Sequence, residues 1–293
     1  MENLGKTFKE LRISRKLTLQ EIANDEFSIS MLSKFENGKT EISVNKLNMA
    51  LSNLHMSINE FYYLANDLEY DKFREIYFKS IRLKNRKDLK GLMKLYNEQI
   101  ALSKTSKLSK FKLLDSIIIA SAIKELDESF ELTEEQRALM HDYLFTIEIW
   151  GEYEMILFTS SIEFFKAKVY LNYAREMLKK IDYFKDMSAI NNMLQTAIIQ
   201  GLFLSIDQDY EFGASYFNKK AYEYIYDTRD AYMKIIYMFA NGYYKIYKGE
   251  IENGKQSIEK SLEILQTLGY TEQYQYYKTS YENILKTFRS ENK

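Results

Sequence analysis

The sequence predicts an all-α protein, and three features of its 293 residues support that class. The chain has no proline and only ten glycines, so the residues that end helices are scarce. Apolar residues recur at three- and four-residue spacing along most of the chain, which is the period of an amphipathic helix. The alternation that is typical of strands is absent from the sequence. We therefore expect short helices over residues 1–66 and a longer helical array over residues 67–293.

Composition excludes several classes of site. The chain has no cysteine, so it has no disulfide framework, thiol nucleophile or thiolate metal site. Its net charge is −1, so binding to nucleic acid would need a local basic face. The longest aliphatic run, residues 117–120, is too short to span a bilayer, and the N-terminus has no apolar signal core. We expect a cytoplasmic protein with no membrane partner.

The sequence contains no convincing catalytic or metal-binding set. Its two histidines, His55 and His141, are expected in different parts of the fold. None of the HExxH, GxSxG, Walker or GxGxxG strings is present. The acidic residues of 207–211 begin like a calcium loop, but Phe212 stands where the sharp turn requires glycine. We therefore expect no enzyme activity, no cofactor and no bound metal.

The first sixty-odd residues carry the start signals of five short helices. Leu4, Phe8 and Leu11 form the apolar stripe of the first helix. Four residues have the type and position of helix N-caps: Thr18, Ser28, Ser43 and Ser57. Thr18 and Ser57 are each followed three residues later by glutamate, which completes a capping box. Together these helices would form a unit with its own core.

Residues 28–40, SISMLSKFENGKT, have the pattern of a recognition helix and its closing turn. The spacing predicts that Ile29, Leu32 and Phe35 face inward, while small and lightly basic residues face outward. Gly38 would end the helix in a left-handed conformation. Taken alone, the segment fits a short amphipathic surface helix equally well.

The predicted first helix is basic. Over residues 1–20 the lysines and arginines outnumber the glutamates and give a net charge of +3. A solvated face would explain this charge in an isolated helix. Beside a recognition helix, the same charge favours contact with phosphate. Arg12 is one of these basic residues.

These motifs resemble those of a known family. The string G-x6-R-x5-T-x2-EIA-x4-S-x-S-x-LS-x2-E-x-G, which begins at Gly5, resembles the phage-repressor (XRE-type) helix-turn-helix. The longer run ISVNKLNMALSNLHMSINEF is similar to the N-terminal domain of the Rgg (GadR/MutR-like) regulators of Gram-positive bacteria. Residues 149–158, around Trp150, resemble the C-terminal domain of that family. Two departures are Leu19, where many XRE domains carry a DNA-contacting glutamine, and the long acidic turn 25–27.

The resemblance implies a transcriptional regulator that binds near-palindromic double-stranded DNA as a homodimer. Ser30, Ser33 and Lys34 would face the major groove. Five further residues would hold the DNA backbone: Arg15, Ser28, Asn37, Lys39 and Thr40. Glu36 would brace its neighbours instead of touching DNA. Because two serines and one lysine read bases weakly, specificity would depend on DNA shape and on paired half-sites.

The remaining residues read as an antiparallel helical array. Helices are expected over 70–84, 87–104, 108–127, 133–149, 152–180, 187–205, 209–226, 229–248, 251–267 and 271–288. A break near Ser161 and a hinge around residues 65–72 are also expected. Five small or apolar residues have the spacing of a tetratricopeptide-like repeat: Gly242, Gly249, Gly254, Ile258 and Ser261. Such repeats stack into an α-superhelix whose concave side suits an extended peptide.

The resemblance also implies that this domain binds a short signalling peptide, as in quorum sensing, and that it dimerises. Five residues are expected to clamp a peptide main chain: Asn172, Arg175, Asn191, Asn192 and Gln195. For each of them taken alone, simple exposure to solvent is the more common explanation. Most tyrosines of residues 210–247 would pack between helices, while Tyr224 and Tyr232 would reach the ligand. Trp150 is expected in the core.

The sequence leaves two alternatives open. The chain could be a helical-repeat scaffold for protein interactions that has lost operator binding. It could also be a DNA-binding regulator whose effector is not a peptide.

Overall fold

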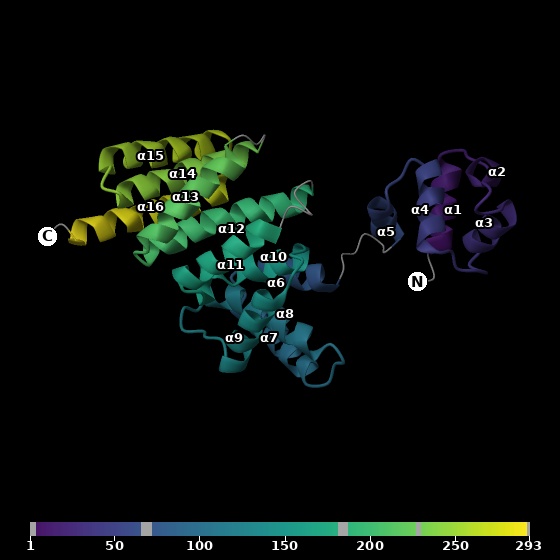
Figure 1. Ribbon diagram of the computed structural model, residues 1–293, viewed down its shortest axis with the longest axis horizontal. Helices are drawn as coiled ribbons and strands as arrows, with labels where there is room; N and C mark the ends of the chain where they lie inside the picture. The colour runs from purple at the N-terminus through teal and green to yellow at the C-terminus, as the bar shows by residue number, and fades with distance from the viewer. Residues whose placement is uncertain (1–3, 66–71, 181–186, 227–229, 292–293) are drawn as a thin grey trace. The chain divides into compact units, whose positions relative to one another are not determined.

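The computed structural model describes residues 4–65, 72–180, 187–226 and 230–291, and these residues form helices joined by loops (Figure 1). The all-α prediction is confirmed, because the only pairing outside helices in those ranges is one isolated bridge between Asn24 and Phe27. Residue contacts divide the chain into two units, Met1–Phe78 and Lys79–Lys293. The predicted domain boundary at residue 66 and most of the predicted hinge fall on residues 66–71, outside the described residues.

The first unit contains the five expected short helices. They are α1 (Leu4–Ser14), α2 (Leu19–Ile22), α3 (Ile29–Glu36), α4 (Val44–Asn53) and α5 (Ile58–Ala65). Their apolar faces meet in one core, in which the Phe8 ring lies edge-on to the rings of Phe35 and Phe61. Side chains from all five helices contribute buried residues to this unit.

The predicted caps start these helices as expected. Thr18 accepts a hydrogen bond from the Glu21 amide, and the Glu21 carboxylate accepts one from the Thr18 amide at 2.7 Å. Ser57 and Glu60 form the same reciprocal pair. These hydrogen bonds lower the pKa of both glutamates, because they stabilise the ionised carboxylate. The boundaries predicted from capping are therefore set by local chemistry.

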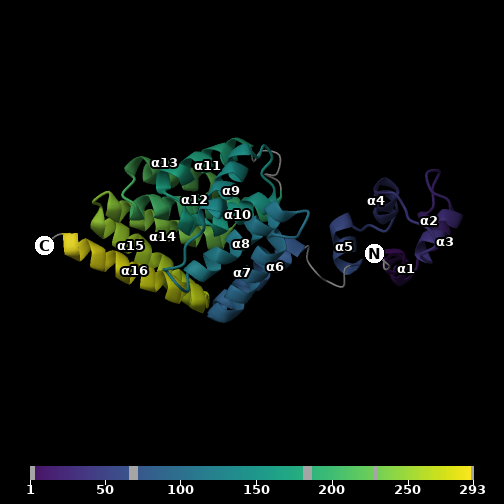
Figure 2. The same ribbon diagram turned by 90° about the horizontal axis from the view of Figure 1, so that it is seen from below.

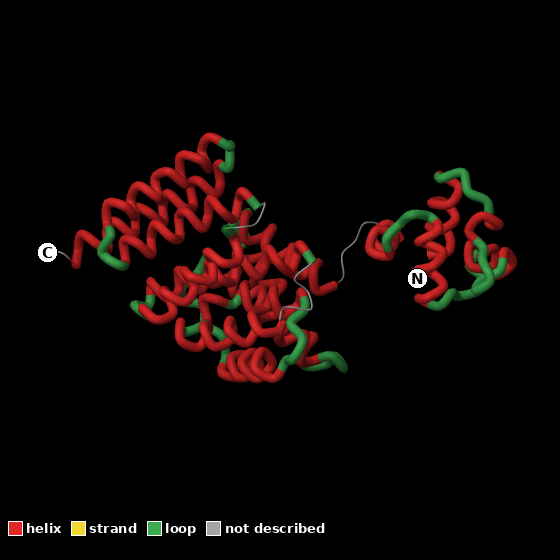
Figure 3. The backbone as a smooth tube through the Cα atoms, turned by 45° about the horizontal axis from the view of Figure 1, so that its top comes forward, coloured by secondary structure: helices red, strands yellow, loops and turns green. Residues whose placement is uncertain are grey.

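The second unit continues the helical array (Figure 3). Its elements are α6 (Lys72–Asn85, which crosses the division between the units), α7 (Leu89–Ser103), α8 (Ser109–Lys124), α9 (Glu134–Thr146), α10 (Glu152–Ser160), the 3-10 turn η1 (Ile162–Phe164), α11 (Ala167–Lys180), α12 (Ser188–Asp207), α13 (Glu211–Ile225), α14 (Ala231–Tyr247), α15 (Ile251–Thr267) and α16 (Thr271–Glu291). The expected break near Ser161 is confirmed, since α10 ends at Ser160.

Helices of the second unit pack side by side, and Figure 2 shows α12, α14, α10 and α8 between α13 and α11 on one side and α16 and α7 on the other. Helices α8, α10, α12 and α14 contact one another in turn. Helices α11 and α13 contact each other, and α15 pairs with α14. Tyr277 of α16 packs against Phe239 of α14, so α16 covers part of α14.

A repeated set of close contacts joins the paired helices. In both α12–α13 and α14–α15, each helix has a glycine at the crossing that leaves no room for a Cβ. The corresponding residues are Gly201, Ser205, Gly213 and Phe217 in the first pair, and Gly242, Ile246, Gly254 and Ile258 in the second. A Cβ on Gly254 would lie 2.6 Å from the carbonyl oxygen of Gly242. The repeat predicted from the last pair therefore extends to the pair before it.

Among the described residues, one helix has the length and hydropathy of a membrane span, over Ala189–Asp207. This helix is α12, which packs against α10, α11, α13 and α14. Its apolar character is explained by this central position, with 56% of the segment buried inside the protein.

Candidate DNA-binding and ligand-binding sites

Helix α3 presents a polar face to solvent. Ser30, Lys34 and Asn37 are exposed and Ser33 is partly exposed, as the spacing predicted. Leu32 and Phe35 are buried, but the expectation that Ile29 faces inward is wrong, since this side chain is 46% exposed. Ile29 is the first residue of α3, where no preceding turn covers it. The outward surface is thus slightly more apolar than predicted.

The end of α3 leads directly into an exposed turn. The Asn37 side chain donates to the Ser33 carbonyl at 2.7 Å and so satisfies one of the last carbonyls of the helix. Gly38 follows with φ +67°, the left-handed conformation that the sequence predicted. Lys39 and Thr40 come next and are both exposed. Ser28 caps the opposite end by accepting from the Met31 amide at 3.3 Å.

A buried ion pair holds α3 against α1. The Arg12 guanidinium donates to both carboxylate oxygens of Glu36, at 2.6 and 2.7 Å, and also to the Leu17 carbonyl at 2.7 Å. The side chains of Arg12 and Glu36 are only 11% and 3% exposed. The hydrogen bonds to Glu36 raise the pKa of Arg12. Glu36 is therefore a brace, as expected, but Arg12 is committed to this pair and is not a free phosphate contact.

Helix α1 also touches the end of α3 through backbone. A Cβ built on Gly5 would lie 1.9 Å from the carbonyl oxygen of Phe35, so no larger residue fits without moving a helix. Gly5 and Arg12 are both part of the motif string in the sequence. They act on neighbouring residues of α3, Phe35 and Glu36, and together fix the direction in which that helix points.

The connection between α2 and α3 is unusual in length. Helix α2 is a single turn of four residues, because Ala23 already has extended backbone with ψ 151°. The Asn24 side chain then accepts hydrogen bonds from the Glu26 and Phe27 amides, and the Phe27 ring is buried. Leu19 packs against the core, so this position offers no polar group to DNA.

Arg15 lies just after α1 and is exposed, with a long hydrogen bond from its guanidinium to the Leu11 carbonyl at 3.4 Å. Its positive charge adds to the lowering of the Glu60 pKa, after the hydrogen bonds from Ser57. The eight residues predicted to contact DNA thus all lie in the first unit, and none of them is buried.

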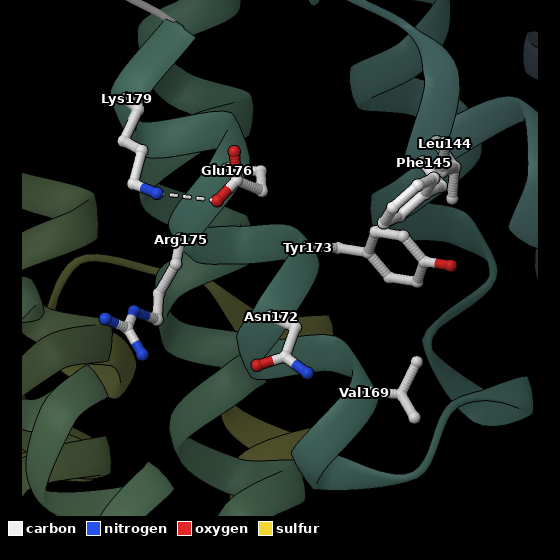
Figure 4. Close-up of a pocket in the computed structure, with 8 residues that line it drawn as sticks. All are labelled: Leu144, Phe145, Val169, Asn172, Tyr173, Arg175, Glu176 and Lys179. Atoms are coloured by element: carbon white, nitrogen blue, oxygen red, sulfur yellow. Dashed lines mark hydrogen bonds and ion pairs between the residues drawn. The ribbon is translucent and has the colours of Figure 1, made fainter.

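The second unit contains a cavity of about 630 Å³ between α9 and α11 (Figure 4). Two of the predicted peptide contacts, Asn172 and Arg175, line it. The other lining residues are Leu144, Phe145, Val169, Tyr173, Glu176 and Lys179. The sequence prediction missed all six, and the two on α9, Leu144 and Phe145, enter the lining only through the packing of α9 beside α11. Those on α11 could have been found from the spacing 169, 172, 173 and 176, which marks one face of a helix.

The other five predicted peptide contacts lie outside this cavity. Gln195 is 1% exposed and donates to the Tyr224 carbonyl at 3.1 Å, which ties α12 to α13. Asn191 is partly exposed and Asn192 is exposed, both on α12. Tyr232 is partly exposed on α14, with its ring centroid 5.4 Å from that of Tyr270. The structure therefore gathers two of the seven residues in one cavity.

His141 and Trp150, which could have had a chemical role, instead pack against other rings inside the second unit. The His141 Nδ1 lies 2.9 Å from the Tyr173 hydroxyl, and burial lowers the pKa of His141. Trp150 is fully buried against Phe158, which confirms the expected core position. No three His, Asp or Glu side chains in the described ranges are arranged to hold a metal ion.

Comparison with known proteins gives consistent matches. A family model described as the C-terminal domain of the HTH-type transcriptional regulator Rgg matches residues 93–279. The SHP pheromone receptor Rgg2 of Streptococcus dysgalactiae is similar in structure, with a TM-score of 0.82, 27% identity, and coverage of 96% of this chain and 99% of that chain. A putative transcriptional regulator from Listeria monocytogenes EGD-e has a TM-score of 0.84 and 21% identity, over 98% and 99% of the two chains. The PrgX/cCF10 complex shares the fold at 12% identity, with a TM-score of 0.72 over 94% and 98%.

Proposed function

Because the chain belongs to the Rgg family of helix-turn-helix transcriptional regulators, we propose that it binds operator DNA through α3 and responds to a short signalling peptide. Regulators of this family are not enzymes, in agreement with the lack of a catalytic set expected from the sequence. The protein acts in the cytoplasm, where its DNA is.

The observation that best supports DNA binding is the exposed polar face of α3, a helix that the buried Arg12–Glu36 ion pair holds against α1. Ser30, Ser33 and Lys34 enter the major groove, while Arg15, Ser28, Asn37, Lys39 and Thr40 hold phosphates. The brace between Arg12 and Glu36 keeps this face in one orientation before DNA arrives. Preorganisation of this kind lowers the ordering cost of binding.

Two copies of the chain bind one near-palindromic operator. A single face with two serines and one lysine supplies few base contacts, so one copy alone discriminates weakly. A homodimer doubles those contacts and adds a fixed spacing between half-sites. Dimerisation belongs to the second unit, as the resemblance to Rgg regulators implies.

Peptide binding to the second unit controls the dimer. The structurally similar Rgg2 is a pheromone receptor, which supports a peptide ligand for this chain in quorum sensing. Asn172 and Arg175 contact it in the cavity between α9 and α11, and Asn191, Asn192, Gln195, Tyr224 and Tyr232 remain proposed contacts on α12–α14. A complete reversal of a 1:99 equilibrium between two dimer arrangements needs differential binding of about 5.5 kcal/mol.

The test is a gel shift of the full chain with DNA from upstream of its own gene. We expect a discrete complex that survives competition by random duplex, and whose affinity changes when short apolar peptides are added. Absence of any preference for the upstream DNA would contradict the operator and favour the scaffold. Operator binding that responds to small metabolites but to no peptide would favour a non-peptide effector.

A further inference from the structure

We propose that the cavity between α9 and α11 binds the free carboxyl end of a short apolar peptide. Its volume of about 630 Å³ lies within the range of small-ligand sites, about 300–1,000 Å³. The inference rests on the proposed function, since it names the chemistry that holds the peptide ligand.

The lining of the cavity carries two cations, Arg175 and Lys179, and one carboxylate, Glu176, so one positive charge is in excess. Lys179 Nζ lies 2.6 Å from Glu176 Oε1, and this hydrogen bond lowers the pKa of Glu176. Arg175 forms no ion pair with any residue in the described ranges. Its guanidinium carbon lies 5.9 Å from the centroid of the Tyr216 ring, within cation–π range. Because a guanidinium presents paired donors, Arg175 matches both oxygens of a carboxylate.

Asn172 can form hydrogen bonds with both polar groups of a peptide bond. Its side chain is exposed and forms no hydrogen bond with another residue that the structure describes. The amide offers both a donor and an acceptor, which fit the carbonyl and N–H groups of a main chain. Figure 4 shows Asn172 between Arg175 on one side and Tyr173 and Val169 on the other. A ligand whose carboxylate lies at Arg175 would therefore place its adjacent peptide bond at Asn172.

The opposite side of the cavity is apolar. Phe145 of α9 is 78% exposed, which is unusual for so large a side chain, and Leu144 and Val169 lie beside it in the lining. The Tyr173 hydroxyl is occupied by His141, so Tyr173 offers its ring to the cavity. An apolar wall facing an excess positive charge across one cavity is the combination expected for a ligand with a carboxylate and an apolar side chain.

A peptide end fits these features in one order. The terminal carboxylate pairs with Arg175, the last peptide bond meets Asn172, and the last side chain covers Phe145 and Val169. A C-terminal amide would carry no charge and would leave Arg175 unpaired. The site therefore distinguishes a free carboxyl end from an amidated one.

The experiment uses the full chain and a pool of short synthetic peptides rich in leucine, isoleucine and valine. Each peptide is made with a free C-terminal carboxylate and with a C-terminal amide. Peptides retained by the protein are separated by gel filtration and counted by mass spectrometry. We expect wild type to retain the free acids about tenfold better, the effect of one charge-assisted contact.

Three variants separate the contributions. Arg175→Gln should remove the preference for the free acid. Phe145→Ala should weaken both forms about fivefold and leave their ratio unchanged, since the side chain is exposed and its loss does not open the core. Lys260→Gln, which removes an exposed charge on α15 outside the cavity, should behave as wild type.

The outcomes distinguish this inference from the proposed function. Equal retention of acids and amides by wild type, or an unchanged preference in Arg175→Gln, would overturn the inference while peptide binding stands. Failure of wild type to retain any peptide in either form would overturn both.

Discussion

The ion pair between Arg12 and Glu36 is the residue-scale feature on which the proposed DNA-binding face depends. Both side chains are nearly buried, and the bidentate geometry fixes their relative orientation. Such a pair adds little net stability over an apolar replacement, but loss of one partner leaves the other charge buried and unpaired. Its main effect is to specify where α3 ends relative to α1.

We predict that Glu36→Gln destabilises the first unit by about 3 kcal/mol, because Arg12 loses its counter-charge in a buried position. Hydrogen exchange of the full chain measures this change. The amides of α1 and α3 should exchange about a hundredfold faster, while those of α14 stay unchanged. Glu41→Gln, at an exposed position in the same unit, is the control. Equal exchange in the two variants would show that the pair does not hold α3.

Prediction at the residue scale succeeded where the interaction is local in sequence. The caps at Thr18, Ser28 and Ser57 depend on contacts three residues away and were read correctly. Arg12 was expected to contact phosphate, but it pairs with Glu36. Helical spacing could not reveal this partner, because it lies 24 residues further along the chain. Ile29 was misplaced because it opens α3, where no preceding turn covers it, and periodicity assigns a face without showing this exposure.

Close approach of paired helices is the main feature at the scale of elements. The glycines of α14 and α15 place each backbone against the other. At the corresponding positions of α12 and α13, Gly201 lies against the Phe217 ring and Gly213 lies against the Ser205 hydroxyl. The sequence predicted this repeat from the last pair alone. The cavity between α9 and α11 was not predicted, since its apolar wall comes from a neighbouring helix.

We predict that Gly254→Ala destabilises the second unit by about 2 kcal/mol. Alanine gains up to about 1 kcal/mol of helix propensity over glycine, but its Cβ would lie 2.6 Å from a backbone oxygen that cannot move independently. Hydrogen exchange at α14 and α15 measures the net effect. The neighbouring substitution Asn253→Ala, at an exposed position, should change little. A Gly254→Ala protein as stable as Asn253→Ala would contradict close backbone packing at this crossing.

At the scale of the whole molecule, a chain of net charge −1 contains the proposed DNA-binding unit and the proposed ligand-binding unit. Attraction to DNA must therefore come from the local face around α3, and affinity should fall steeply with salt. The sequence predicted the two kinds of unit through their motifs. The proposed effect of a peptide on operator affinity acts through a dimer, and contacts between two chains leave no periodic pattern in the sequence of one.

The most direct test of the central claim compares Lys34→Ala with wild type on the upstream DNA and on random duplex, over a series of salt concentrations. Lys260→Ala, on α15 in the second unit, serves as the control. If Lys34 reads a base edge, Lys34→Ala should weaken operator binding by about 1–3 kcal/mol and weaken random binding less. Equal losses on both duplexes would show that Lys34 touches only phosphate. No loss on either would contradict α3 as the element that binds DNA.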